Sequence, residues 1–155
     1  MLVSPGDILR PMEIPVRVLR PDATLPVYAH EGDAGCDLVA VETRVIKAGG
    51  GRAMVSTGLS VAIPEGHGGF VLPRSGLAAK HGVTCINAPG LIDAGYRGEV
   101  MVALVNLDPT HDYEVKKGDR IAQLVVLPVP LASFTPVEEL PPAKRGEGGF
   151  GSSGR

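Results

Sequence analysis

The sequence lacks any apolar run of about 18 residues, the length at which a helix becomes able to cross a lipid bilayer. It also lacks a basic excess, because 15 lysines and arginines stand against 17 acidic residues and the formal net charge is −2. Nucleic-acid-binding domains normally carry a basic stripe or patch. We therefore expect neither a membrane span nor a nucleic-acid partner, although a few focused arginines can still hold a small polyanion.

Cysteine is scarce as well. Cys36 and Cys85 lie far apart and show neither C-x-x-C spacing nor histidines at the spacing of a zinc site. Two reduced thiols are therefore expected, as is usual in cytosolic proteins. Residues 1–13 lack the basic region and the apolar stretch of a secretory signal peptide. Together these absences predict a cytoplasmic protein.

Glycine and proline, in contrast, are frequent, with 21 and 14 residues spread along a chain of 155. Between them lie short β-branched runs, which are typical of strands separated by turns. This pattern predicts one all-β domain, a sandwich, jelly roll or barrel, with a single short helix at 75–80 that ends before Gly82. The predicted strands are 14–19, 45–46, 53–55, 59–63, 70–72, 83–86, 100–105 and 121–127.

A long loop and a glycine-rich end depart from this pattern. Residues 87–98 lie between strand runs and are too many for a two-residue hairpin, and a loop of this length in a compact domain is often functional. Residues 141–155 are rich in glycine and serine and carry one large apolar side chain, Phe150. Such a segment buries too little surface to order itself, so we predict a β domain over 1–140 and a flexible tail over 141–155.

Five separate segments carry the most specific signal in the chain. They are AGCDLVA at 34–40, PRSGLA at 73–78, GLIDAGYRGE at 90–99, GDRIAQL at 118–124 and RGEGGFGSSG at 145–154. In order and spacing they resemble the five motifs of the homotrimeric dUTPase family. Each segment alone is a weak signal, whereas the joint match spans most of the chain and is highly specific.

The resemblance implies Mg²⁺-dependent hydrolysis of dUTP to dUMP and pyrophosphate on a distorted jelly-roll-like β fold. Such an enzyme keeps uracil out of DNA and supplies dUMP for dTMP synthesis. The resemblance also implies a homotrimer whose sites combine motifs from more than one subunit, with the fifth motif arriving on a swapped tail.

By the same resemblance, Asp93 is the base that takes a proton from the water attacking the α-phosphate, a role worth about 10²–10⁴-fold in rate. Tyr96 lies beneath the deoxyribose and leaves no room for a ribose 2′-hydroxyl. The amide of Asn87 and nearby backbone groups read uracil, because a site built on hydrogen bonds rejects a base with the wrong donors. Four further residues line the uracil pocket: Gly90, Leu91, Ile92 and Met101.

The expected phosphate contacts lie in the second and fourth motifs. Arg74, Ser75 and Gly76 stand at the start of the predicted helix, where free amide groups and a planar guanidinium favour anions. Gln123 donates to the same phosphate chain. Asp37 either orients water bound to Mg²⁺ or holds an arginine in place, since Mg²⁺ is bound mainly by substrate phosphates and one or two carboxylates.

The fifth motif is interpreted as a lid over the bound nucleotide. Arg145, Gly151 and Ser152 reach the phosphates, where glycine lets the backbone approach closely, and Phe150 stacks on the base. The plainer interpretation of this tail is a flexible linker.

Plainer interpretations stay open for the other residues as well. Asp93 fits a turn aspartate that caps its own backbone, Tyr96 a core or turn tyrosine, and Ser75 a helix N-cap. The apolar residues around the predicted base site also fit ordinary core packing, and both roles are compatible.

Two other functions compete with dUTP hydrolysis. A dCTP deaminase has a similar fold, but it carries a glutamate in the strand after the loop, where this chain has Ala103. A jelly-roll binding module without enzymatic activity is the second alternative, because this architecture hosts many unrelated functions. Release of pyrophosphate from dUTP in the presence of Mg²⁺ separates the three.

Overall fold

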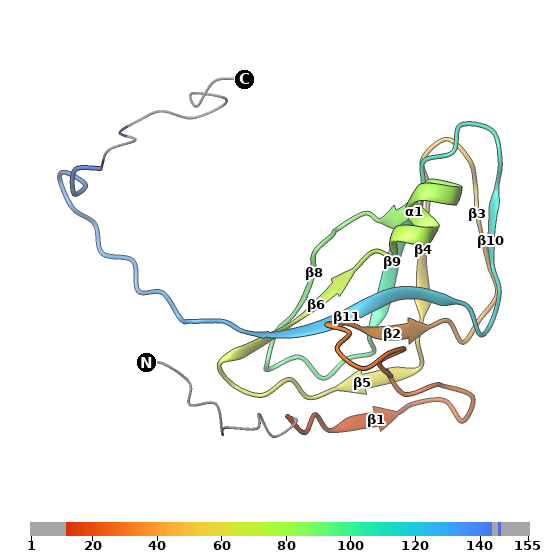
Figure 1. The fold of residues 1–155 in the computed structure, drawn as a ribbon, viewed down its shortest axis with the longest axis horizontal. Helices are drawn as coiled ribbons and strands as arrows, with labels where there is room; N and C mark the ends of the chain where they lie inside the picture. The colour runs from red at the N-terminus through yellow and green to blue at the C-terminus, as the bar shows by residue number, and fades with distance from the viewer. Residues whose placement is uncertain (1–11, 144–145, 147–155) are drawn as a thin grey trace.

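The computed structural model describes residues 12–143 and 146, and the predicted all-β fold with one short helix is confirmed (Figure 1). The elements are β1 (Val16–Val18), β2 (Cys36–Val39), β3 (Arg44–Ile46), β4 (Gly51–Ser56), β5 (Leu59–Val61), β6 (His67–Leu72), α1 (Ser75–His81), β7 (Val83–Cys85), β8 (Gly90–Ile92), β9 (Met101–Asn106), β10 (Tyr113–Val115) and β11 (Arg120–Pro128).

All pairings between these strands are antiparallel. One sheet has the order β2-β11-β6-β8 and a second has the order β4-β9-β7, while β1 pairs with β5 and β10 pairs with β3. Within the described residues the strands thus form sheets and no closed barrel. Neighbouring strands are often far apart in sequence, so the sheets bring distant motifs together.

The two larger sheets share one apolar core. Leu38 of β2 and Ile121 of β11 come from the first sheet, and Val102 and Leu104 of β9 come from the second; each is 1% exposed. Because successive strand residues point to opposite faces, the alternate β9 residues Met101 and Ala103 face away from this core. This outward face of β9 forms one wall of the pocket described below.

The helix α1 follows the prediction closely. It begins after Arg74 and ends at Gly82, whose left-handed backbone (φ +64°) lets its N–H bond to the carbonyl oxygens of Ala78 and Leu77. In the part of the chain that the structure describes, no helix is long and apolar enough to cross a membrane.

Three strands were not predicted, namely β2, β8 and β10. Each has only three or four residues, and β2 carries an aspartate, so none shows a β-branched run. Segment 87–98, predicted as a loop, contains β8, which pairs with β6 through Val71 opposite Gly90. The middle of this loop is therefore anchored to the four-stranded sheet.

After Pro128 the chain leaves the sheets. Residues 129–143, here called the C-terminal arm, run away from the domain in an extended path (Figure 1). Its apolar side chains lie in solvent: Leu131 is 99% exposed, Phe134 93% and Leu140 83%. The predicted boundary at residue 141 stays a prediction, because residues 144–145 and 147–155 lie outside the described part.

Cys36 and Cys85 are both free thiols. Cys85 is buried in β7, and this burial raises the pKa of its thiol to about 11, because the thiolate is disfavoured in apolar surroundings. Cys36 is half-buried in β2, beside Asp37.

Candidate active site

A cavity of about 250 Å³ lies between the loop that carries β8 and the outward face of β4 and β9. Seven residues that the sequence placed around the base, the sugar and the attacking water line it: Asn87, Gly90, Leu91, Ile92, Asp93, Tyr96 and Met101. The structure thus brings these residues together, and their individual roles stay predictions.

The wall nearest β6 depends on a missing side chain at Gly90. A Cβ atom at this position would lie 3.1 Å from Asn87 Nδ2 and 3.3 Å from Val71 Cβ. Both separations are tighter than ordinary contacts, so a larger residue would push the Asn87 amide out of place. Gly90 therefore allows the Asn87 amide to sit directly against β8 at the edge of the pocket.

Asp93 follows β8 directly and is exposed at the pocket. Its backbone carbonyl accepts a hydrogen bond from Tyr96 N at 3.0 Å, which closes a turn. Among the residues that the structure describes, the Asp93 carboxylate has no hydrogen-bond or ion-pair partner. The carboxylate does not cap this turn, which argues against the plainer interpretation and leaves both oxygens free to accept a proton.

Tyr96 is not a core residue, but hydrogen bonding and packing hold its side chain in place. It is 44% exposed, and its hydroxyl donates to the backbone oxygen of Glu99 at 2.9 Å. The ring lies against Gly98, where any Cβ atom would overlap it. The Arg97 guanidinium holds the same turn, since its Nη1 donates to the carbonyl oxygens of Ala94 (2.6 Å) and Tyr96 (2.7 Å).

A second group of predicted residues surrounds a buried carboxylate. Asp37 on β2 is 5% exposed, with Arg74 Nε 3.3 Å from its Oδ1 and Arg120 Nη1 3.2 Å from its Oδ2. The Arg74 guanidinium also donates to the backbone oxygen of Arg120 at 3.1 Å. We call Asp37, Arg74 and Arg120 the arginine cluster. A buried carboxylate that faces two guanidinium groups matches the predicted role of Asp37 in holding an arginine in place.

The start of α1 lies beside this cluster and corrects one interpretation. Arg74, and not Ser75, is the N-cap residue, and it makes no side-chain capping bond. Ser75 and Gly76 form the first turn of the helix and are exposed there. Gln123 lies on β11 opposite Asp37 and Leu72, so it reaches the same region from the neighbouring strand.

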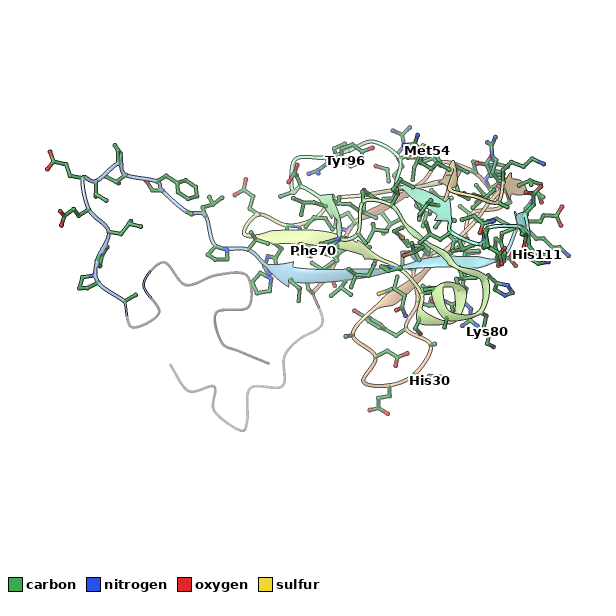
Figure 2. The ribbon with its side chains drawn as sticks, turned by 90° about the horizontal axis from the view of Figure 1, so that it is seen from above. His30, Met54, Phe70, Lys80, Tyr96 and His111 are labelled. Atoms are coloured by element: carbon green, nitrogen blue, oxygen red, sulfur yellow. The ribbon has the colours of Figure 1, made fainter. Side chains whose placement is uncertain are left out.

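The pocket and the arginine cluster do not meet in one chain, because none of the cluster residues lines the cavity. Figure 2 shows Tyr96 and Met54 on one side of the molecule, whereas Lys80 on α1 lies toward the other. The predicted tail residues Arg145, Phe150, Gly151 and Ser152 lie outside the described residues. Within the described residues, the predicted site residues therefore fall into two groups.

The sequence did not point to several residues that the structure adds. Glu99 and Met54 line the pocket, and Arg120 completes the arginine cluster. Glu99 and Arg120 stand within the third and fourth motifs, so their place in the motifs was the available signal. Met54 gave no such signal, because only the pairing of β4 with β9 brings it to the cavity.

Metal-binding capacity in the described residues is small. No group of three or more histidine, cysteine, aspartate or glutamate side chains is arranged to hold an ion. Asp37 Oδ1 is buried and accepts no hydrogen bond among the described residues, and Arg74 Nε lies 3.3 Å from it. With guanidinium groups facing both oxygens, this carboxylate does not fit a direct metal ligand.

The described residues thus combine an all-β fold, a pocket lined by Asn87, Asp93 and Tyr96, and a separate arginine cluster. The sequence model of the dUTPase family matches residues 21–154. The chain belongs to the dUTPase family.

Similar proteins carry the same description. The deoxyuridine 5′-triphosphate nucleotidohydrolase of Thermobifida fusca (strain YX) is 54% identical over 143 residues, which cover 92% of this chain and 79% of that protein. The enzyme of the same name from Cutibacterium acnes (strain DSM 16379 / KPA171202) is 56% identical over 130 residues, which cover 84% of this chain and 85% of that protein.

Solved dUTPase structures share the fold. The dUTPase of Staphylococcus bacteriophage 80alpha with dUPNHPP has a TM-score of 0.84 and 32% identity, covering 92% of this chain and 99% of that one. A mutant dUTPase from phage phi11 of S. aureus, described with a structural Mg(II) ion, has a TM-score of 0.72 and 29% identity, covering 83% of this chain and 98% of that one.

Proposed function

We propose that this protein hydrolyses dUTP to dUMP and pyrophosphate, with Asp93 as the base. The observation that carries the proposal is the pocket, in which an amide, an aromatic ring and a carboxylate that has no partner among the described residues converge from one short segment. The direct test is release of pyrophosphate from dUTP with Mg²⁺, with dCTP and UTP as comparison substrates. Ammonia release from dCTP, or inertness toward dUTP, would refute the proposal.

In the proposed reaction the oxygen of a water molecule forms a bond to the α-phosphorus. The bond between that phosphorus and the oxygen bridging to the β-phosphate breaks, and pyrophosphate leaves. The proton of the water passes to the Asp93 carboxylate, which suits this role because Asp93 is exposed at the pocket and pairs with no other described residue. The base therefore acts at the sugar end of the pocket, where the α-phosphate begins.

Recognition of uracil falls to the wall around Asn87. A side-chain amide offers both a donor and an acceptor, and backbone groups of the β8 loop supply the rest. Cytosine reverses the donor and acceptor at ring positions 3 and 4 and would leave buried groups unpaired. Leu91, Ile92 and Met101 enclose the base with apolar surface.

The triphosphate is assigned to the arginine cluster, the start of α1 and Gln123, together with the tail residues Arg145, Gly151 and Ser152. Phe150 is assigned to the base. When bound, Mg²⁺ offsets the negative charge on the phosphate oxygens. Asp37 would act on the hydrated ion only through water, while it keeps Arg74 oriented.

The same reaction requires more than one chain, because the pocket and the arginine cluster are separate within one subunit. We propose a homotrimer in which the cluster and tail of other subunits complete each pocket. The exposed C-terminal arm supports this proposal, since Leu131, Phe134 and Leu140 are uncovered in the single chain and large exposed apolar surface marks an interaction site.

We expect light scattering in dilute buffer to give the mass of about three chains per particle, as for a closed cyclic assembly. The reason is that both the arm and the split site need partners. Light-scattering measurements at low and high salt distinguish association through apolar contacts from association through ion pairs. A fully active monomer would contradict the shared site.

We expect Tyr96→Ala to raise the ratio of kcat/KM for UTP to that for dUTP. The ring that occupies the space of a 2′-hydroxyl is removed, and shape alone rejects an added hydroxyl by up to about 10²-fold. The ratio is measured with both nucleotides at subsaturating concentration. Tyr28→Ala, which alters an exposed tyrosine that does not line the pocket, is the control. An unchanged ratio for Tyr96→Ala would place sugar selection elsewhere.

The deaminase alternative loses support at β9. Ala103 lines the pocket at the position where a glutamate is needed for that chemistry, and a methyl group cannot transfer protons. Hydrolysis is therefore the function that these side chains serve.

A further inference from the structure

Glu99 has no role in the reaction proposed above, although it joins the pocket to another segment of the chain. It lies between β8 and β9, is half-buried, and lines the pocket together with Asp93 and Tyr96. Its Oε1 accepts a hydrogen bond from Gly58 N at 2.8 Å and a short one from Ser56 Oγ. These donors stand at the end of β4 and in the turn that leads to β5, some forty residues earlier in the chain.

The contact belongs to a longer seam between the same two segments. Ser60 Oγ donates to the Arg97 carbonyl at 2.7 Å, Thr57 Oγ1 donates to the Val100 carbonyl at 2.6 Å, and Val100 N donates to the Leu59 carbonyl at 2.7 Å. Thr57 and Ser60 are buried, 0% and 5% exposed, so their hydroxyls depend on these acceptors. Within this seam, Glu99 provides the contact made by an ionisable side chain.

Glu99 is also the residue to which Tyr96 is attached. The Tyr96 hydroxyl donates to the Glu99 carbonyl, and the ring reaches it by lying over Gly98. A shift of Glu99 therefore moves the only acceptor that the Tyr96 hydroxyl has among the described residues. The route from the β4–β5 turn to the Tyr96 ring consists of two hydrogen-bonding steps through one residue.

We propose that Glu99 is a positioning residue which, by joining its segment to the β4–β5 turn, fixes the Tyr96 ring and thereby sets the preference for deoxyribose over ribose. The sugar preference in this inference rests on the proposed function. The acceptor, and not the negative charge, is the property required, because a hydroxyl and an amide N–H both donate to the same Oε1. Glutamine keeps such an oxygen, whereas alanine leaves Gly58 N and Ser56 Oγ without their partner.

The test compares Glu99→Ala and Glu99→Gln, with Glu114→Ala, at an exposed position of β10, as the matched control. We expect Glu99→Ala to raise the ratio of kcat/KM for UTP to that for dUTP by about tenfold, since small misplacements of a positioned group have large effects. Glu99→Gln and Glu114→Ala should keep the wild-type ratio. An unchanged ratio in Glu99→Ala, or an equal change in Glu99→Gln, would overturn the inference.

A second readout does not depend on activity. The chain has three tyrosines, so incorporation of 3-fluorotyrosine gives three ¹⁹F resonances, and Tyr96→Phe identifies that of Tyr96. Glu99→Ala should shift or broaden this resonance and leave those of Tyr28 and Tyr113 in place. Ser56→Ala removes one of the two donors to Glu99 and should give a smaller change in this resonance. It provides a second test in case Glu99→Ala misfolds.

The outcomes separate the two proposals. If the wild-type protein does not hydrolyse dUTP, the proposed function fails, and the fluorine spectra still decide whether Glu99 holds Tyr96. If dUTP is hydrolysed and Tyr96→Ala changes the sugar ratio while Glu99→Ala does not, the inference alone fails. An undisturbed Tyr96 resonance in Glu99→Ala would also overturn it.

Discussion

We expect Asp93→Asn to fold and bind nucleotide normally while losing about 10²–10⁴-fold or more in kcat, the range for a lost general base. Asparagine has nearly the same shape as aspartate but cannot accept the proton of the attacking water at neutral pH. The Asp93 side chain makes no hydrogen bond or ion pair within the described residues that its replacement would break, so the fold should be unaffected. Single-turnover hydrolysis of dUTP, with enzyme in excess, measures the chemical step directly.

The control for this variant is Asp33→Asn, a change of the same kind in an exposed loop. Asp33 Oδ2 accepts a hydrogen bond from His30 N at 2.8 Å, and an asparagine oxygen can still accept it. This variant should therefore hydrolyse dUTP at the wild-type rate. Near-normal single-turnover hydrolysis by Asp93→Asn, with binding intact, would remove Asp93 from the role of base.

Deletion of residues 144–155 should leave the melting temperature nearly unchanged and reduce kcat/KM severely, by at least about 10²-fold. The deleted segment holds one large apolar side chain, Phe150, so it adds little to the core. Catalysis should suffer because, in the proposed site, Arg145, Gly151 and Ser152 bind the phosphates and the tail excludes water. Calorimetry and steady-state kinetics on the same preparation measure both effects.

A shorter deletion provides the control. Removing Arg155 alone keeps the whole fifth motif at 145–154, and this variant should retain activity. Ordering a glycine-rich segment costs about 1–2 kcal/mol per residue in backbone entropy, so the lid should close only on a triphosphate. A non-hydrolysable dUTP analogue with Mg²⁺ should therefore protect the segment from proteases. Full activity after the long deletion, or equal cleavage with and without the analogue, would return the tail to a passive linker.

The sequence predicted most of the fold because its long strands carry apolar runs. The runs at 100–105 and 121–127 became β9 and β11, which lie at the centres of the two larger sheets. The short strands were missed for the converse reason. The residues of β8 are held as a strand by their pairing with β6, and this partner is not visible in three residues of sequence.

The site was predictable where one motif supplies several residues. Asp93 and Tyr96 come from one segment, and their meeting at a pocket needs only that segment to fold back. Glu99 stands in the same motif. Its partners Ser56 and Gly58 lie at and just after the end of β4, and they come close to Glu99 because β4 pairs with β9. Contacts of this kind depend on strand register, which local pattern does not encode.

If the exposed C-terminal arm joins copies as proposed, the activity of the protein depends on its concentration. Leu131, Phe134 and Leu140 are uncovered in the single chain. In the proposed homotrimer another copy covers them, and association is governed by mass action. Activity per mole of chain should then fall on dilution instead of staying constant, and so should resistance to heat. For such a protein, the activity of each chain depends on the number of copies in the cell.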